Sequence, residues 1–174
     1  MIQKYEQTTF ETCLSVSLLN LLNVKISKKK EFEMLIHALK FSKKDFAIGH
    51  LDYTVKKFNK KLDLYMDEGV CFNYIKQFTF SRKIFLTEEK INIKLVNKLL
   101  EKKPIILYID SYYLYKIAHY PHFIIVIKKV KEQYEIFDPW DGKIKQVPIK
   151  TISKAIISLR NHIKLCPKII QTTN

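Results

Sequence analysis

The sequence predicts an α+β protein, in which a helical first half packs against an antiparallel sheet formed by the second half. Apolar residues recur at helical spacing through the first part of the 174-residue chain. Short apolar runs separated by turn residues dominate residues 104–148. Hydrophobic residues make up 47% of the chain, with only 3 Gly and 5 Pro, which favours a packed core over disorder.

The first half is expected to contain helices and one short strand. Thr9 or Thr12 can cap a helix that runs to about Leu22, because a threonine oxygen accepts from the first free N–H groups. The segment KLDLYMD alternates as a strand does. Further helical spacing covers residues 31–39, 51–60 and 73–78.

The second half is expected to begin with a helix and continue with strands. Thr87 precedes Glu88 and Glu89, a pattern that predicts a helix start, and Pro104 ends this helix at Lys103. Four β segments follow, PIILYID, HFIIVIKKV, QYEIFD and KIKQVPI, and a last helix covers residues 152–160. No internal repeat or low-complexity tract divides the chain, so residues 1–174 are predicted to form one domain.

The charge of the chain favours an acidic partner over nucleic acid. Lys and Arg exceed Asp and Glu by 31 to 17, giving a net charge of +14. The lysines occur in short pairs and triplets, without the interleaved glycines and aromatics of RNA-binding strands and without zinc-finger spacing. We therefore expect a solvated basic surface, which would steer an acidic protein or peptide substrate towards the molecule.

Composition also argues against a membrane, a metal or another cofactor. No apolar run approaches the roughly 18 to 20 residues that a membrane span needs, and the segment MIQKYEQTTFETC is too polar for a signal peptide. The 3 cysteines form neither a disulfide framework nor a CxxC pair. A reducing cytoplasm is the expected setting, and the sequence does not define an oligomeric state.

Four residues together suggest a cysteine nucleophile. Cys13 opens the apolar run CLSVSLLNLL six residues after Gln7, at a predicted helix start whose free N–H groups favour thiolate over thiol. His122 heads HFIIVIKKV and Asp138 lies in the turn DPWDG, so the histidine can take the thiol proton and the carboxylate can orient the ring. The Gln7 amide is expected to donate to a developing oxyanion.

The predicted hairpin brings two of these residues together. If the turn between HFIIVIKKV and QYEIFD centres near Val130, positions 122 and 138 lie opposite each other on one face of the sheet. A turn shifted by one residue would separate them, because each residue step reverses the face.

Each candidate residue also has an ordinary structural explanation. Buried cysteines are common in cores, and Cys71 and Cys166 lack a histidine or glutamine at comparable spacing, so both are expected to be structural. Asp138 would also suit a plain Asp-Pro turn. His119 competes with His122 but lies in a loop before the strand. The other histidines are expected at the surface or at helix caps: His37, His50 and His162.

Gln7, Cys13, His122 and Asp138, in that order, resemble the papain-like cysteine enzymes of the C39-peptidase-like branch. The stretch HFIIVIKKVKEQYEIFDPWDG is similar to the His-to-Asp segment of that branch, including Trp140 after Asp-Pro. The resemblance implies a papain-like fold, a Cys-His-Asp triad, an oxyanion role for Gln7, and a site in the cleft between the helical half and the sheet.

A second likeness concerns PIILYIDSYYLYKIAHYPHFIIV, which is similar to the run before the active histidine in the N-terminal domain of butirosin-type acyltransferases. Those enzymes move an acyl group from a carrier protein to an amine. The likeness places Asp110 and Tyr113 in a structural or substrate-facing segment, and Trp140 beside the site. C39-type peptidases carry Asp-Cys-Gly at the nucleophile, whereas this chain has Thr12-Cys13-Leu14, which favours transfer over proteolysis.

Three functions remain open from the sequence. The favoured one is amide-bond formation, in which Cys13 takes an acyl group from a carrier-protein thioester and passes it to an amine. The alternative is a C39-like cysteine peptidase that hydrolyses a peptide. The third is an inactive C39-like domain that binds a peptide or a carrier protein. Trp140, Asp110 and Tyr113 are the predicted substrate-binding residues.

Overall fold

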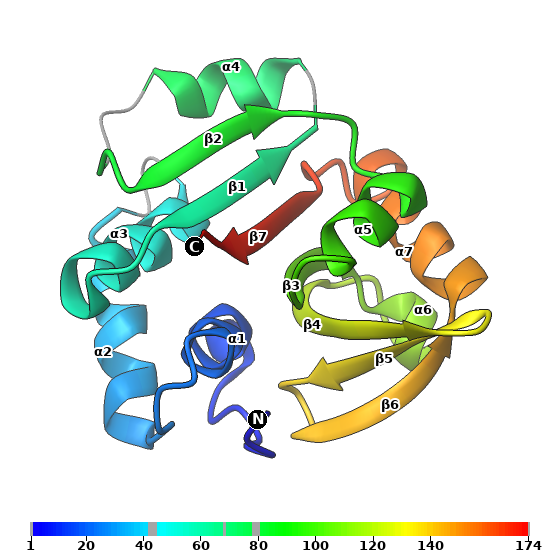
Figure 1. The fold of residues 1–174 in the computed structure, drawn as a ribbon, viewed down its shortest axis with the longest axis horizontal. Helices are drawn as coiled ribbons and strands as arrows, with labels where there is room; N and C mark the ends of the chain where they lie inside the picture. Colours follow the sequence, from blue (N-terminus) through cyan, green and yellow to red (C-terminus); the bar gives the residue numbers. More distant parts are fainter. Residues whose placement is uncertain (1, 42–44, 68, 78–80, 174) are drawn as a thin grey trace.

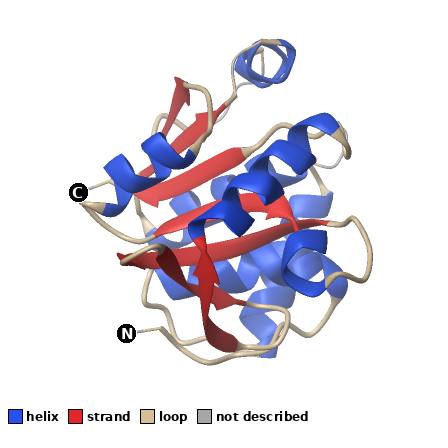
Figure 2. Ribbon diagram, turned by 90° about the vertical axis from the view of Figure 1, so that its right-hand side faces the viewer, coloured by secondary structure: helices blue, strands red, loops and turns tan. Residues whose placement is uncertain are grey.

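A computed structural model describes residues 2–41, 45–67, 69–77 and 81–173, and it confirms the α+β class. Within the described residues, seven strands form a single sheet, and helices cover both of its faces (Figures 1 and 2).

The sheet is mixed rather than purely antiparallel. Its strands, in spatial order, are β2 (Ile84–Glu88), β1 (Leu62–Met66), β7 (Lys168–Thr172), β3 (Ile105–Asp110), β4 (Pro121–Val130), β5 (Gln133–Asp138) and β6 (Lys143–Pro148). Strands β1 and β2 run parallel, and all other neighbouring pairs are antiparallel. The predicted antiparallel sheet is therefore correct for the part that carries His122 and Asp138 and wrong for the β1–β2 edge.

The helices are the 3₁₀ helix η1 (Phe10–Thr12) and the α-helices α1 (Cys13–Leu21), α2 (Lys28–Leu39), α3 (Phe46–Phe58), α4 (Val70–Lys76), α5 (Ile93–Leu100), α6 (Tyr112–Tyr115) and α7 (Ile149–Asn161). Helix α1 packs against β3 and β4, and α2 and α3 lie behind it. Helices α5 and α7 cover the opposite face of these strands.

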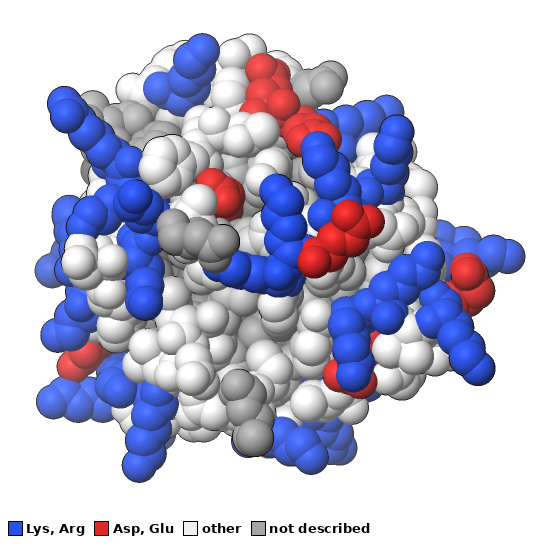
Figure 3. Space-filling model, in the orientation of Figure 1, with Lys and Arg blue, Asp and Glu red and all other residues white. Residues whose placement is uncertain are grey.

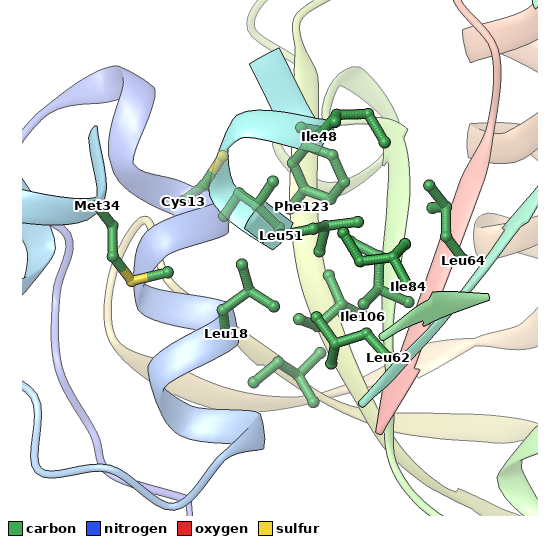
Figure 4. Close-up of a cluster of buried hydrophobic side chains, with 14 of the residues drawn as sticks. Cys13, Leu18, Met34, Ile48, Leu51, Leu62, Leu64, Ile84, Ile106 and Phe123 are labelled. Atoms are coloured by element: carbon green, nitrogen blue, oxygen red, sulfur yellow. The ribbon is translucent and has the colours of Figure 1, made fainter. Parts of the chain in front are cut away.

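Two hydrophobic cores lie on the two sides of the sheet. The first joins α1 to the strands and includes Leu18, Ile106 and Phe123, with Cys13 at its margin (Figure 4). The second lies under α5 and α7 and includes Leu107 and Ile124. Because β3 is covered on both faces, its sequence is a continuous apolar run rather than an alternating one.

Two predicted elements differ from the structure. Thr87 and Glu88 belong to β2, and the helix begins later at Ile93, where the Asn92 side chain accepts a hydrogen bond from the backbone N–H of Leu95 at 3.0 Å. The predicted 87–103 helix is therefore wrong for residues 87–92, and it also ends at Leu100 rather than at Lys103. The predicted helical turn 73–78 overlaps the observed helix α4, which spans Val70–Lys76. Residue 78 lies outside the described residues.

The strand β7 was not predicted, although it lies in the middle of the sheet. It is only five residues long, and its adjacent residues Ile169 and Ile170 are both fully buried. A short strand buried on both faces lacks the alternation that marks strands in a sequence.

A β-bulge sets the register of the β4–β5 hairpin. The sequence had predicted a turn centred near Val130. In the structure Val130 pairs with Gln133, so the turn consists of the two residues 131 and 132. That turn alone would put His122 and Asp138 on opposite faces. The pairing shifts by one residue between Val126 and Lys128, so that Val126 faces Ile136. The shift restores the two side chains to one face, as diagonal rather than direct neighbours.

Candidate active site

Cys13 is the first residue of α1, as the sequence predicted. The 3₁₀ helix η1 runs directly into α1. The Thr12 hydroxyl donates to the Thr9 carbonyl oxygen at 2.8 Å and accepts from the Thr9 N–H at 3.3 Å, which fixes the turn before the cysteine. The Cys13 side chain is 7% exposed, at the edge of the core. Leu14 is fully buried in that core, so it packs behind the site.

His122 and Asp138 form a buried pair beside Cys13. The Nε2 atom of His122 lies 2.8 Å from Oδ1 of Asp138, and both residues are almost completely buried. His122 also hydrogen-bonds to Cys13. Because Nε2 faces the carboxylate, Nδ1 is the ring nitrogen left for the sulfur. The structure therefore brings together the three predicted residues in the order Cys13, His122, Asp138.

The environment of the pair favours a protonated imidazole. Burial by itself lowers the pKa of His122, but hydrogen bonds to Asp138 and to Cys13, together with their charges, raise the pKa to about 9. Burial likewise raises the pKa of Asp138, but the His122 hydrogen bond and charge outweigh it and hold that pKa well below its usual range. At neutral pH the pair is thus an imidazolium held by a carboxylate.

Two residues that the sequence interpretation missed hold the second oxygen of Asp138. Oδ2 accepts hydrogen bonds from the Tyr115 hydroxyl and, at 3.1 Å, from Nζ of Lys145. Oδ1 also accepts from the backbone N–H of Trp140 at 3.0 Å. Asp138 therefore has partners for both oxygens, which fixes the plane of the carboxylate. Tyr115 and Lys145 are positioning residues.

One sequence signal could have identified Lys145. Lys143 pairs with Asp138 across β5 and β6. Lys145 lies two positions after Lys143 and is therefore on the same face of the sheet. Its charge is shared between Asp138 and Asp141, the latter at 2.8 Å. Tyr115 had no comparable signal, because the short helix α6 was not predicted.

Gln7 lies near the start of the Cys13 helix, but its amide is already bonded. Its Nε2 donates to the carbonyl oxygens of Thr9 at 2.8 Å and Phe10 at 3.2 Å, while its buried Oε1 atom has no hydrogen-bond partner among the described residues. Its backbone N–H donates to the Pro139 carbonyl at 2.8 Å, which ties the segment to the Asp138 turn. An oxyanion role would require Nε2 to exchange one of these carbonyls for the substrate.

Trp140 lies against the triad. Its ring centroid is 5.6 Å from that of His122, in an edge-on arrangement, and 5.2 Å from that of Tyr115. Phe10 also contacts Trp140, with 5.1 Å between the ring centroids. The tryptophan therefore covers the His122–Asp138 pair from solvent.

Asp110 and Tyr113, the other predicted substrate-binding residues, do not join the triad. Asp110 is fully buried and binds His119 Nδ1 and the Ser158 hydroxyl, both at 2.6 Å. Tyr113 packs against the core under α5 and α7. Asp110 therefore anchors the loop between β3 and β4 to α7, and His119, the rival of His122, belongs to this separate pair.

The remaining cysteines and one buried histidine make contacts of their own, separate from the His122–Asp138 pair. Cys166 is buried next to the exposed Cys71, a proximity that their sequence spacing did not suggest, and burial raises the pKa of the Cys166 thiol to about 12. His50 is fully buried within α3 and hydrogen-bonds to the Ser15 hydroxyl at 3.1 Å. The expectation of a surface or cap position is therefore wrong for His50, which is a core residue.

The described part of the chain has neither a metal-binding cluster nor a membrane-spanning helix. No cluster of three or more His, Cys, Asp or Glu side chains there is arranged to hold a metal ion. None of the described helices is long and apolar enough to span a bilayer.

No protein-family model matches the chain, and no curated protein matches its sequence.

Proposed function

We propose that the protein is a papain-like cysteine enzyme of the C39-like branch that catalyses acyl transfer, taking an acyl group from a carrier-protein thioester and passing it to an amine. The observation that supports this proposal is the Cys13–His122–Asp138 arrangement at the first residue of α1. This is the general pattern of an activated nucleophile: the thiol hydrogen-bonds to a histidine, and a buried carboxylate holds the histidine in place.

In the first step, the Cys13 sulfur attacks the thioester carbonyl carbon. The carbonyl oxygen becomes an oxyanion, which accepts hydrogen bonds from the backbone N–H of Cys13 and from Nε2 of Gln7. For this, the Gln7 Nε2 atom gives up its hydrogen bond to the Thr9 or the Phe10 carbonyl. The bond from the carbonyl carbon to the donor sulfur then breaks. The donor leaves as a thiol with the proton that His122 carried, so Cys13 is acylated and His122 is neutral.

In the second step, neutral His122 acts as the base. It removes a proton from the attacking amine while the amine nitrogen bonds to the carbonyl carbon. The bond between this carbon and the Cys13 sulfur breaks, which releases the amide and restores the thiolate beside a protonated His122. Asp138, fixed by Tyr115 and Lys145, stabilises the charged ring in the resting state and orients it throughout.

The charge of the molecule favours a carrier protein as the donor. Acyl carriers are acidic, and this chain carries a net charge of +14. Figure 3 shows Lys and Arg side chains projecting around the outline of one face, with acidic side chains among them near its top and centre. An encounter between such surfaces is fast at low salt and is slowed by screening. We propose a reducing cytoplasm as the setting, because Cys13 stays a free thiol there.

The test is intact-protein mass spectrometry after mixing with acylated carrier proteins, with and without a primary amine such as ethanolamine. We expect an acyl adduct on Cys13 that the amine discharges faster than water does. Cys13→Ala should abolish the adduct, and His122→Ala should slow its formation by about 100-fold or more, because the leaving thiol loses its acid.

Cys71→Ala is the matched control, because Cys71 is exposed and should not carry the adduct. An adduct that disappears in Cys71→Ala and persists in Cys13→Ala would refute the proposal. Cleavage of a peptide library without any thioester adduct would instead identify a peptidase. Binding of carrier proteins or peptides without either reaction would identify an inactive binding domain.

A further inference from the structure

Cys71 and Cys166 are far apart in the sequence, yet their thiols lie side by side. Cys71 is the second residue of α4, and Cys166 lies between α7 and β7, two residues before the strand begins. The two thiols are within hydrogen-bonding distance of each other. Both residues also line one surface hollow of about 230 Å³. The fold therefore brings two of the three cysteines of the chain into contact at a place outside the triad.

The two thiols differ in their access to solvent. Cys71 is exposed, whereas Cys166 is only 8% exposed. Burial raises the pKa of the Cys166 thiol to about 12, although the charge of Lys168 favours its thiolate. Cys166 is therefore protonated at neutral pH and slow to react with a dissolved oxidant, while Cys71 can meet one. An accessible thiol beside a second thiol is the usual arrangement of an oxidisable cysteine pair.

The hollow that contains the two cysteines is also lined by basic side chains. Arg160 and Lys164 both belong to it, and Arg160 is held by an ion pair with Asp67. Positive charge near a thiol favours the thiolate, which is the form that reacts with an oxidant. The surroundings of Cys71 therefore assist its oxidation.

The helix that carries Cys71 is attached by few apolar contacts. Helix α4 is seven residues long, and its buried side chains are Phe72 and Ile75. Val70 is 86% exposed and Tyr74 is 46% exposed. Figure 1 shows α4 at the margin of the molecule, beyond β2. A short segment with so little buried surface opens locally at a low cost in free energy, so Cys71 can adjust to the geometry that a disulfide requires.

We propose that Cys71 and Cys166 form a site of reversible oxidation, where a peroxide converts the two thiols into a disulfide that joins α4 to the segment before β7. Cys71 is the thiol that reacts with the peroxide, and Cys166 is the thiol that reacts with oxidised Cys71. The central strand β7 would then be linked covalently to a helix that is otherwise held by two apolar side chains.

The reaction has two steps. The Cys71 sulfur first attacks an oxygen of hydrogen peroxide: an S–O bond forms, the O–O bond breaks, and the departing hydroxide leaves as water with the thiol proton. The Cys166 sulfur then attacks the sulfur of this sulfenic acid. The S–S bond forms, the S–O bond breaks, and the second hydroxide takes the Cys166 proton and leaves as water. Two thiols lose two electrons and one peroxide gains them, and a dithiol reverses the change by thiol–disulfide exchange.

The test uses Cys13→Ala, because this variant keeps Cys71 and Cys166 as its only cysteines. The protein is treated with equimolar hydrogen peroxide, its remaining thiols are blocked with iodoacetamide, and its peptides are mapped by mass spectrometry. We expect a disulfide between Cys71 and Cys166 in a protein that stays monomeric on a non-reducing gel. Dithiothreitol should restore both thiols.

Single substitutions in the Cys13→Ala background separate the roles of the two thiols. In Cys166→Ser, Cys71 should stop at the sulfenic acid, which dimedone traps. In Cys71→Ser, Cys166 should remain a thiol. The matched control adds Asn73→Cys to Cys71→Ser: residue 73 is exposed and lies two positions further along α4, about 200° around the helix, so its thiol should not join Cys166.

Thermal unfolding measures the effect of the link on the fold. A disulfide that closes a loop of about 100 residues restricts the unfolded chain, so oxidation should raise the melting temperature by about 10 °C. An unchanged melting temperature would overturn the tethering of α4. Two free thiols after peroxide treatment, dimers linked through Cys71, or an equal yield of disulfide in the Asn73→Cys control would overturn the oxidation site. Because Cys13 is absent from every variant tested, these outcomes are independent of the acyl-transfer proposal.

Discussion

The buried carboxylate of Asp138 is the group whose removal should change the site most directly. Asp138→Asn keeps the shape of the side chain and can keep an oxygen towards His122 and the Trp140 N–H. It removes the negative charge, and it turns an amide NH₂ towards Lys145, which has no lone pair to accept it. The protonated state of His122 should therefore be lost without a large change in packing.

The magnitude of this change follows from the surroundings of the ring. Burial lowers the pKa of His122, and Asp138 and Cys13 together raise it to about 9, against an ordinary value of 6.5. Without the carboxylate, we expect the pKa to fall to 6.5 or below. A fall of about 2.5 in pKa corresponds to about 3 kcal/mol of lost stabilisation of the imidazolium. At pH 7.5 the ring should change from mostly protonated to mostly neutral.

Long-range ¹H–¹⁵N NMR of the histidine rings measures this directly, because the chain has only 5 histidines. In the unmodified protein His122 should stay doubly protonated up to about pH 9, and in Asp138→Asn it should be neutral at pH 7.5. Asp110→Asn is the control, since it breaks a similar buried Asp–His pair that contains His119 instead. A His122 ring that remains an imidazolium at pH 7.5 in Asp138→Asn would refute the assignment of Asp138 as its stabilising partner.

Two further predictions concern the helices that support Cys13. His50 is fully buried, and burial lowers its pKa to about 4 from 6.5. The unfolded chain therefore binds a proton that the folded chain rejects, and between pH 7.5 and 5 this should cost about 2 kcal/mol of unfolding free energy. Urea denaturation should show a smaller loss in His50→Gln, and an equal loss would count against the buried neutral ring. Gly49→Ala should lower the melting temperature by several degrees, because the new Cβ would lie 2.7 Å from Cα of Ala38 in the neighbouring helix; an unchanged value in thermal unfolding would mean that α2 and α3 separate easily.

Local sequence patterns predicted the parts of the fold that are governed by local contacts. The helix start at Cys13 was predicted correctly, but the threonine caps were not. The Thr9 hydroxyl has no hydrogen-bond partner among the described residues, and the Thr12 hydroxyl bonds back to the Thr9 backbone instead of capping α1. The strands β3 to β6 followed from apolar runs bounded by turn residues. Two of the three triad residues were placed on the same hairpin, although their register was wrong by two positions.

The features that were missed depend on distant contacts. Strand β7 is stabilised by pairing with β1 and β3, which leaves no local signal in the segment itself. The approach of Tyr115 to Asp138 depends on the path of the loop after β3. Likewise, the spacing of residues in the sequence does not determine which acceptors the Gln7 amide binds. In the structure it donates to the carbonyl oxygens of Thr9 and Phe10.

The bulge in β4 limits where the length of this chain can change. Residues can be added at the hairpin tip, between Val130 and Gln133, without moving anything on the His122 side of the bulge. Loss of the single residue Ile127 would remove the bulge but keep Val126 opposite Ile136 and Lys128 opposite Glu135, so His122 would stay on the same face as Asp138. A single residue lost between His122 and Val126 would instead turn the His122 side chain to the other face, away from Asp138. Insertions for tags, probes or grafted peptides therefore belong at the tip.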